Sequence, residues 1–517
     1  MFRIGPYRWW WLGGVAFQVG CAARNAVLPA GHLPPPPAPL DVQTAIALTS
    51  GPTAKPEPAT KTGAFQIPQA LPGGGMPFVT VPKFAPTATP GERDHAVRAA
   101  YPVLTPVAAT IPRDGAALSL PELEQLAMAN SPAIKKATAE AAAVYGQVIQ
   151  AGLYPNPTAG YQVDQVQPNL RIPPGSTASG AGQQGGFINQ LIKTAGKLSL
   201  AQQVAGFDYI NALVAVRASQ VAVTAKVRSA YFTALVAQRN AAISKALADM
   251  IDEVYGLQLK RVAAGVDAGY EPLQLYAQAV QARSVHAQAQ ATVQASWKQL
   301  AAAVGQPDLP PSDLAGQADA VAPVLDEVAA KARILEQHTD LLTARNSVAQ
   351  SRTNLVLQRR MPIPDIGTNQ YHQYDNAAQT YQFGVQIGIA LPIFDRNQGH
   401  IRTAESKIVA NTLHLEATRN DLFAKFAEAY GRYRASTVAA TNSRDKVLPS
   451  LTQAYQAIVR RYQVEPDKVG FGDIVVAQQN LATALQTYLQ ALDTQWKAVV
   501  DTAEISQVDE LYPTQAK

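Results

Sequence analysis

The segment Tyr381-Gln-Phe-Gly-Val-Gln-Ile-Gly-Ile-Ala-Leu391 decides which fold this sequence predicts. Its side chains alternate almost perfectly between large apolar types and polar or small types, which is typical of a β-strand. A strand of a water-soluble sheet usually carries charge on its outer face, but here the second face carries only Gln, Gly and Ala. Eleven residues is also about the length of a tilted strand that crosses a bilayer. We therefore predict a lipid-facing side formed by Tyr381, Phe383, Val385, Ile387, Ile389 and Leu391.

Three further segments are predicted as strands. Residues 158–164 repeat the alternation more weakly, and 184–192 and 366–373 complete two strand pairs, joined by polar loops at about 167–183 and 373–379. Four strands cannot close a membrane barrel, because the smallest such barrels have about eight. An open sheet edge in lipid would leave backbone groups without hydrogen-bond partners. If these strands lie in a membrane, the chain must oligomerise, and three copies would supply twelve strands.

The strands lie within two similar halves of the chain. Landmarks of the same kind recur in the same order, first 207 and then 199 residues apart: Ser131-Pro132 with His338-Thr339, Pro155-Asn156-Pro157 with Pro362-Ile363-Pro364, and Ala230-Tyr231 with Ala429-Tyr430. A unit of about 200 residues is far longer than a solenoid repeat, so the pattern indicates a single duplication.

Each half predicts the same order of elements: a helical region, two strands, a very long helix, a turn and a returning helix. The first helical regions, at about 119–152 and 323–360, end at Pro-x-Pro, since proline cannot continue a helix. The long helix from about Leu198 to Val262 contains no proline, and its 65 residues would span roughly 97 Å. Its counterpart, from about His400 to Tyr462, contains Pro449 and should be kinked there.

The N-terminal part of the sequence predicts export and attachment. Residues 1–21 have the layout of a secretory signal: two positive charges, a short apolar run and then Gly20-Cys21. This end resembles a bacterial lipoprotein cleavage site, although Gln18 stands where such sites usually carry Leu. We expect Cys21 to be the lipid attachment residue; an ordinary signal peptide with an incidental cysteine is the alternative. Residues 22–117 hold 18 of the 37 prolines, which predicts an extended tether rather than a packed domain.

The composition and motifs exclude several functions. With 47% hydrophobic and 16% charged residues, the chain is apolar enough to fold and too charged for a polytopic helical membrane protein. Lys and Arg are scattered along it, so we expect no nucleic-acid partner. There is no nucleophile-elbow, phosphate-loop or zinc-protease spacing, and the seven histidines include no close pair at metal-ligand spacing. We predict that the protein is not an enzyme and has no catalytic residue, cofactor or metal site.

The tandem order of elements over about 118–506 resembles the TolC-type outer-membrane efflux protein family. The residues that carry the resemblance are Asn130-Ser131-Pro132, Pro155-Asn156-Pro157, Gly196-Lys197 and Ala230-Tyr231 in the first half, and Leu391-Pro392-Ile393-Phe394, Ala429-Tyr430 and Tyr462 with Gly472-Asp473-Ile474 in the second. Residues 391–399 are especially similar to the heavy-metal and resistance-nodulation-division branch of the family. On this basis 118–322 and 323–506 are two efflux repeats, followed by a tail at 507–517.

The resemblance implies a mainly α fold with a small transmembrane β part: a homotrimer with an α-helical tunnel through the periplasm and a twelve-stranded β-barrel in the outer membrane. It also implies two partners, a periplasmic adaptor (membrane fusion) protein and an inner-membrane pump of the resistance-nodulation-division or another type. The implied function is a passive exit duct for small toxic compounds or metal ions. Two alternatives stay open: an exit duct for polypeptides in type I secretion, and a structural coiled-coil lipoprotein of the envelope, against which the strand at 381–391 argues.

The resemblance also assigns a gate. In TolC-like proteins the turn between the last two long helices forms the periplasmic mouth, where acidic residues keep the channel narrow. Asp473 falls on the first acidic position of that motif, and Val476 stands where TolC has a second acid. Glu271, in the corresponding turn of the first half, is a similarly placed acid. The alternative for Asp473 is that it only caps the returning helix, and the two roles are compatible.

Overall fold

The computed structural model describes most of the chain beyond its N-terminal segment: residues 83–85, 87–107, 117–165, 182–465, 468–509 and 511. All of these belong to the larger of two compact units, Phe78–Lys517, which is described here by itself. Cys21, the predicted lipid attachment residue, lies outside the described residues.

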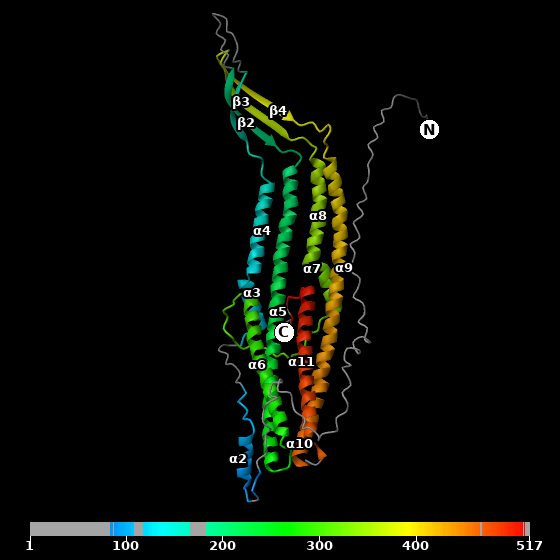
Figure 1. Ribbon diagram of the computed structural model, residues 1–517. Coiled ribbons are helices and arrows are strands. Elements are labelled where there is room, and N and C mark those ends of the chain that lie inside the picture. The colour runs from blue at the N-terminus through cyan, green and yellow to red at the C-terminus, as the bar shows by residue number, and fades with distance from the viewer. Residues whose placement is uncertain are drawn as a thin grey trace, which may run out of the picture. The chain divides into compact units, whose positions relative to one another are not determined.

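The four predicted strands form one antiparallel sheet in chain order (Figure 1). They are β1 (Thr158–Asp164), β2 (Gln183–Ile192), β3 (Ile366–Asp375) and β4 (Thr380–Ile389). The central pair, β2 with β3, joins the two halves of the chain through ten residue pairs. The prediction of two strands in each half is thus confirmed, except that β4 ends at Ile389, so Ala390 and Leu391 lie beyond it.

The register of the sheet gathers the predicted lipid-facing residues on one face. Tyr381, Phe383, Val385, Ile387 and Ile389 share that face and are 54–71% exposed. The registers of the three strand pairs place the exposed side chains of Tyr161, Val163 and Ile188 on the same face, separated from those of β4 by Thr368, Gln370 and His372 of β3. Leu391, just past the strand, is 67% exposed.

The opposite face combines glycines, aromatic rings and a polar network. Gly160, Phe187, Tyr371 and Gly384 form one row across the four strands. A Cβ atom at Gly160 or Gly384 would collide with the ring of Phe187 or Tyr371, which explains why these two strand positions are glycine. Beyond this row, amide groups donate to two carboxylates: Gln162 and Gln373 to Asp164, and Gln183 and Gln382 to Asp375.

The helices follow the duplicated order. The first repeat contains α3 (Leu120–Asn130), α4 (Pro132–Ala151), α5 (Lys197–Ala263) and α6 (Glu271–Val304); the second contains α7 (Glu327–Gln337), α8 (Thr339–Arg360), α9 (Gln398–Asn442), α10 (Leu448–Val464) and α11 (Phe471–Ile505). The long proline-free helix is confirmed, since α5 has 67 residues without a break. Each first helical region is divided in two, at Ser131 and at His338. None of the described helices has both the length and the apolar character that a membrane-spanning helix requires.

The counterpart of α5 is interrupted in a different way from the predicted kink. A short π-helical segment, η1 (Ser443–Val447), separates α9 from α10. Pro449 then falls at the start of α10, where a missing backbone donor is tolerated. The widened π-turn lets the helix continue past the proline with one irregular segment.

Aromatic side chains hold the segment that joins the two repeats. Residues 305–326 contain no helix or strand apart from one bridge between Leu314 and Leu118. Five aromatic donors of the surrounding helices bind carbonyl oxygens of this segment: Trp297 to Leu309, Tyr231 to Ala315, Trp496 to Ala318, Tyr433 to Pro323 and Tyr430 to Leu325. The main apolar core lies beside it, with Trp496 stacked on Phe232.

One part of the proline-rich segment is folded. Helix α2 (Pro90–Ala100) lies within 22–117, where we predicted only an extended tether. Thr89 and Glu92 cap it reciprocally, and Pro90 occupies the first turn, where proline is favoured. Val97 is fully buried, and α2 packs on α5. For residues 83–107 the prediction of a tether is therefore wrong.

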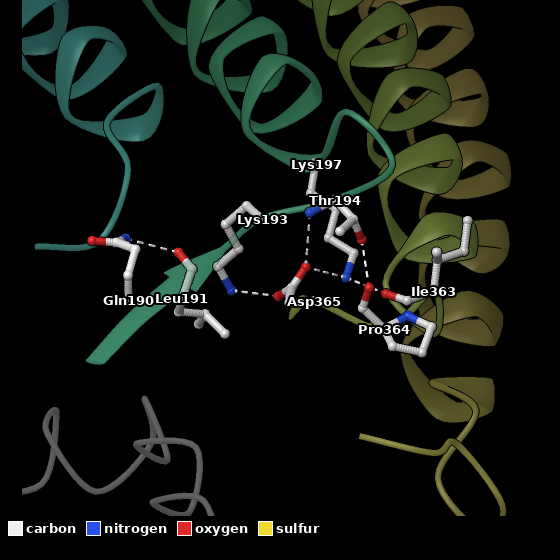
Figure 2. Close-up of polar contacts among 8 residues, drawn as sticks. All are labelled: Gln190, Leu191, Lys193, Thr194, Lys197, Ile363, Pro364 and Asp365. Atoms are coloured by element: carbon white, nitrogen blue, oxygen red, sulfur yellow. Dashed lines mark hydrogen bonds and ion pairs between the residues drawn. The ribbon is translucent and has the colours of Figure 1, made fainter. Parts of the chain in front are cut away.

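A partly buried charge cluster joins the sheet to the helices (Figure 2). Asp365, immediately before β3, accepts hydrogen bonds from Lys193 Nζ at 2.9 Å, Lys197 Nζ at 2.8 Å and the Thr194 backbone N–H at 3.1 Å. Lys197 is only 6% exposed. Thr194 also donates to the Pro364 carbonyl at 2.6 Å. Because Asp365 belongs to the second repeat and its partners to the first, this cluster joins the repeats where sheet and helices meet.

The electrostatics of the cluster favour the ionised carboxylate. Burial opposes ionisation of Asp365, but hydrogen bonds from Lys193 and Lys197 outweigh it and hold the pKa of Asp365 well below its ordinary value. A carboxyl group with a depressed pKa in the folded state stabilises the fold above its ordinary pKa. This contribution is lost as the pH falls through the depressed value.

Asp365→Asn should destabilise the fold by roughly 3–5 kcal/mol at neutral pH, because it leaves the Lys197 ammonium buried without a carboxylate. Thermal unfolding of the purified protein in detergent, followed by circular dichroism, measures the effect. The difference from the native protein should shrink as the pH falls below about 4, because the carboxyl group of the unfolded protein protonates there, whereas that of folded Asp365 protonates only at lower pH. Glu405→Gln, which breaks the exposed pair with Arg359, is the control and should cost less than about 1 kcal/mol. Equal effects of the two changes would contradict the role given to Asp365.

Candidate functional site

The candidate site lies where the long helices end, at the end away from the sheet (Figure 1). There α5 turns into α6, and α10 turns into α11. An apolar cluster joins the two helical hairpins: Val254, Tyr255, Leu259, Val262 and Leu275 from the first, and Tyr455, Tyr462, Ile474 and Leu481 from the second. Val97 and Tyr101 of the α2 segment belong to the same cluster. Side chains of the two hairpins are thus packed together at the turns.

Five polar side chains, which we call the tip cluster, lie on this apolar base: Gln258, Arg261, Asp267, Glu271 and Tyr462. Arg261 binds Asp267 through two hydrogen bonds, of 2.6 and 2.8 Å. The Tyr462 hydroxyl donates to Asp267 Oδ2 at 2.7 Å and lies 2.7 Å from Gln258 Oε1. Gln258 is fully buried and donates to both Asp267 and Glu271. Asp267, in the α5–α6 turn, therefore binds a tyrosine that the second hairpin supplies.

The ring of Tyr462 strengthens the same connection. The Arg261 guanidinium carbon lies 4.2 Å from the centroid of that ring, within the range of a cation–π contact. Tyr462 is 4% exposed, so both the ring and its hydroxyl contacts are shielded from water. Burial, together with the hydrogen bond to Asp267, raises the pKa of Tyr462, and the hydroxyl keeps its proton for donation.

The two carboxyl groups of the tip cluster have opposite pKa shifts. Burial opposes ionisation of Asp267, but the hydrogen bonds from Arg261 and Tyr462 outweigh it and lower the pKa of Asp267. Burial raises the pKa of Glu271, and the negative charge of Asp267 adds to the increase. Asp267 is thus the charged centre of the cluster, whereas ionisation of Glu271 is less favourable than that of an isolated glutamate.

The structure separates the two predicted gate residues. Glu271 belongs to the tip cluster, but Asp473 lies at the start of α11 and is exposed. Asp473 Oδ2 accepts from the Gly470 backbone N–H at 2.9 Å, the contact of a helix cap. Among the described residues no hydrogen bond or ion pair joins Asp473 to Glu271. The capping contact of Asp473 is therefore present, and its exposed charge leaves the second predicted role open.

Sequence reasoning missed three members of the tip cluster: Gln258, Arg261 and Asp267. Arg261 and Asp267 are six residues apart, a spacing that only the folded turn brings within bonding distance. The available signal was Tyr462, which is part of the pattern shared with the TolC-type family. A tyrosine at a helix end beside an acidic turn of the other repeat could have indicated a cross-repeat contact.

The tip cluster can act as a lock. To separate the second hairpin from the α5–α6 turn, the Tyr462 hydroxyl must leave Asp267 and the ring must leave Arg261. Separation of the hairpins must also part the apolar side chains that join them. In the described part of the chain, the tip cluster included, no group of three or more His, Cys, Asp or Glu residues is arranged to hold a metal ion.

Comparison with known proteins identifies a matching family. The family model described as outer membrane efflux protein matches residues 123–306 and 331–503, one match in each repeat. The chain is 25% identical over 406 residues to the cobalt-zinc-cadmium resistance protein CzcC of Cupriavidus metallidurans. That alignment covers 76% of this chain and 91% of the relative.

Solved structures share the fold at low sequence identity. CusC matches with a TM-score of 0.64 and 16% identity, over 78% of this chain and 98% of that chain. VceC from Vibrio cholerae matches with a TM-score of 0.60 and 17% identity, over 75% and 95%. A membrane protein from Pseudomonas aeruginosa matches with a TM-score of 0.62 and 18% identity, over 78% and 99%. The mainly helical fold is therefore shared along nearly the whole length of these chains.

Glu271→Gln should raise the apparent melting temperature at neutral pH, because it removes a buried negative charge beside Asp267 while keeping an acceptor for Gln258. A carboxyl group with a raised pKa stabilises the fold below its ordinary pKa, and this contribution is lost as the pH rises through the raised value. The gain should therefore disappear below the ordinary glutamate pKa, about 4.3.

Melting curves from acidic to neutral pH test this, with Glu416→Gln on an exposed side chain of α9 as the matched control. The control should show no such pH-dependent difference. A lower melting temperature for Glu271→Gln at neutral pH would mean that the ionised form stabilises the tip cluster.

Proposed function

The chain belongs to the outer membrane efflux protein family, and from this premise we propose that three copies form an exit duct across the periplasm and the outer membrane. The observation that carries the proposal is the four-stranded sheet, which has an exposed apolar face and stands on long helices from both repeats. A sheet of this kind meets lipid with one side and a water-filled lumen with the other. Three copies would supply the twelve strands of a closed barrel.

The division into two faces supports this arrangement. On β4 the face proposed to meet lipid carries Phe383, Val385, Ile387 and Ile389, and the same face of β2 and β3 also includes Gln190, Gln370 and His372. The other face carries glycines, two aromatic rings and the glutamine–aspartate network. Polar groups that bind one another across strands suit a lumen wall, because they are satisfied with or without water. The helices below would continue the lumen through the periplasm.

The duct would be passive. We propose that a periplasmic adaptor and an inner-membrane pump supply cargo and energy, and that this chain performs no catalysis. The helical tip, where both hairpins turn, would be the end that meets them. The tip cluster would then keep the mouth narrow until its contacts are broken.

We propose divalent transition-metal cations as the cargo. The relative with 25% identity over most of the chain is named for cobalt, zinc and cadmium resistance. A duct for ions requires weak contacts along its wall, since transit depends on release. Exposed acidic residues near the mouth, such as Asp473, would raise the local cation concentration without holding an ion.

Tyr462→Phe should raise the single-channel conductance in planar bilayers, because it removes the hydroxyl that joins the second hairpin to Asp267 while keeping the aromatic ring.

Asp473→Asn tests the charge at the mouth in the same recordings: it retains an acceptor for Gly470 and removes the charge. Three exposed carboxylates around a narrow axis would attract cations, so this variant should keep the conductance and reduce cation preference and block by multivalent cations.

Unchanged conductance in Tyr462→Phe would exclude the tip cluster as the lock. Unchanged selectivity and cation block in Asp473→Asn would leave that residue only its helix cap.

Deletion of the gene in its native host should lower tolerance of cobalt, zinc and cadmium salts several-fold, and the native gene supplied in trans should restore it. Growth with an uncharged organic antibiotic is the comparator. If deletion lowered tolerance of the antibiotic alone, the proposal of a duct would stand, but its cargo would be organic compounds and not metal cations. Unchanged tolerance of every compound, in a host without a second duct of the family, would contradict the efflux function.

A further inference from the structure

The sheet leaves two edges available for pairing with a second copy. In the described part of the chain β1 pairs only with β2, and β4 pairs only with β3. We propose that β4 of one copy pairs antiparallel with β1 of the next in a single register, which places Ile389 opposite Val163. This inference rests on the proposed function, because it specifies how the copies of the duct join.

The register follows from the internal duplication. The two residue numbers of every β1–β2 pair total 347, and those of every β3–β4 pair total 755. The totals differ by 408, which is the sum of two sequence offsets, that of β3 from β1 and that of β4 from β2. Two landmarks in the sequence give these offsets separately, and together the offsets make 408. Pro155 and Pro362 are 207 apart, and Gly196 and Asn397 are 201 apart.

The second landmark is a match of backbone conformation. Gly196 precedes α5 with φ 66° and ψ 24°, and Asn397 precedes α9 with φ 61° and ψ 22°. Both residues therefore end their strand-to-helix connection in the same left-handed conformation. β3 follows its counterpart β1 by 207 residues, and β4 follows β2 by 201.

The register of β2 with β3 inside the chain then predicts the register of β4 with β1 of the next copy. Every β2–β3 pair has residue numbers that total 558. To obtain the junction between copies, each β2 residue is replaced by the β4 residue 201 positions later, and each β3 residue by the β1 residue 207 positions earlier. The two residue numbers of every such pair then total 552. Ile188 opposite Gln370 becomes Ile389 opposite Val163 of the next copy. Gln190 opposite Thr368 becomes Leu391 opposite Tyr161 in the same way.

The chemistry of the side chains agrees with this register. Val163, Tyr161, Ile389 and Leu391 are 49–67% exposed apolar residues, and the pairing places each beside another apolar residue on the same face. On the other face it places Asp164 opposite Gly388. A shift by one residue would bring side chains of opposite faces together. The register also extends β4 beyond Ile389, which gives Leu391 a strand partner that it lacks in the isolated chain.

The junction between chains lacks the charges of the junction within the chain. By the same offsets, Asp365 corresponds to Thr158, whereas Lys193 and Lys197 correspond to Phe394 and Gln398. The carboxylate and both ammonium groups are thus replaced by neutral side chains. Phe394 is 89% exposed, so it is available to a neighbouring copy. The junction within one chain therefore combines backbone pairing with a charge cluster, whereas the proposed junction between chains has backbone pairing and apolar contact without those charges.

Cysteine pairs test the register. Val163→Cys with Ile389→Cys should give a disulfide between copies in most of the oxidised protein, because directly opposite Cα atoms lie about 4.5–5.5 Å apart, within the range of a disulfide. Within one chain β1 and β4 are three strand spacings apart, roughly 14 Å, so the product must join two chains. Tyr161→Cys with Leu391→Cys provides a second matched pair in case the first impairs folding.

Two mismatched pairs are the controls, each two residues out of register: Val163→Cys with Ile387→Cys, and Val163→Cys with Leu391→Cys. They should cross-link no more than variants with only one introduced cysteine. Non-reducing electrophoresis of membranes measures the product. Cross-linking of a mismatched pair in preference to both matched pairs would overturn the register. So would no cross-linking of any pair in a protein that native mass spectrometry shows to be oligomeric. A monomer in the membrane-extracted native protein would overturn the proposed duct as well.

Discussion

Backbone groups at the edge of a sheet need hydrogen-bond partners, and in hydrocarbon only another strand can supply them. This requirement acts on β1 and β4, whose outer edges have no partner within the described part of the chain. In the proposed trimer, this requirement accounts for the junction of the repeats in the middle of the sheet, which leaves the outer edges of β1 and β4 for neighbouring copies. The long helices of both repeats, α5 and the α9–α10 pair, would then end at a common level and form the mouth of the proposed duct.

Two clusters of charged groups lie at the two ends of the helical part. Asp365 with Lys193 and Lys197 lies beside the sheet, and Asp267 with Arg261 lies at the turns. Both clusters join the first repeat to the second. They differ in composition: the cluster beside the sheet combines one carboxylate with two lysines, whereas the tip cluster includes a glutamate with a raised pKa and the hydroxyl group of one tyrosine. In the proposed duct, the first would be a permanent attachment and the second a contact that opens.

The sequence predicted the elements whose signal is local. The alternation at 381–391 and the proline-free run of α5 were sufficient for the strand and the long helix. Contacts between distant residues were not predictable in this way. Asp365 and Lys193 are 172 residues apart, and Tyr462 and Asp267 are 195 apart, so no periodicity connects them. Helix α2 was missed for a different reason: proline content dominates the composition of its surroundings, although Thr89 and Glu92 form a recognisable capping box.

The segment 305–326, held by five aromatic donors, also has a mechanical consequence. Because helices of both repeats bind its carbonyl oxygens, the helices cannot slide along it, but they can tilt about it as about a pivot. On α11, Trp496 marks this pivot, and Ile474 lies 22 residues away at the mouth, a lever arm of about 33 Å. A tilt of about 5° moves the far end by about 3 Å, which is enough to break a hydrogen bond such as that from Tyr462 to Asp267. In the proposed duct, a small rotation at the level of Trp496 would therefore be sufficient to shift the helices at the mouth.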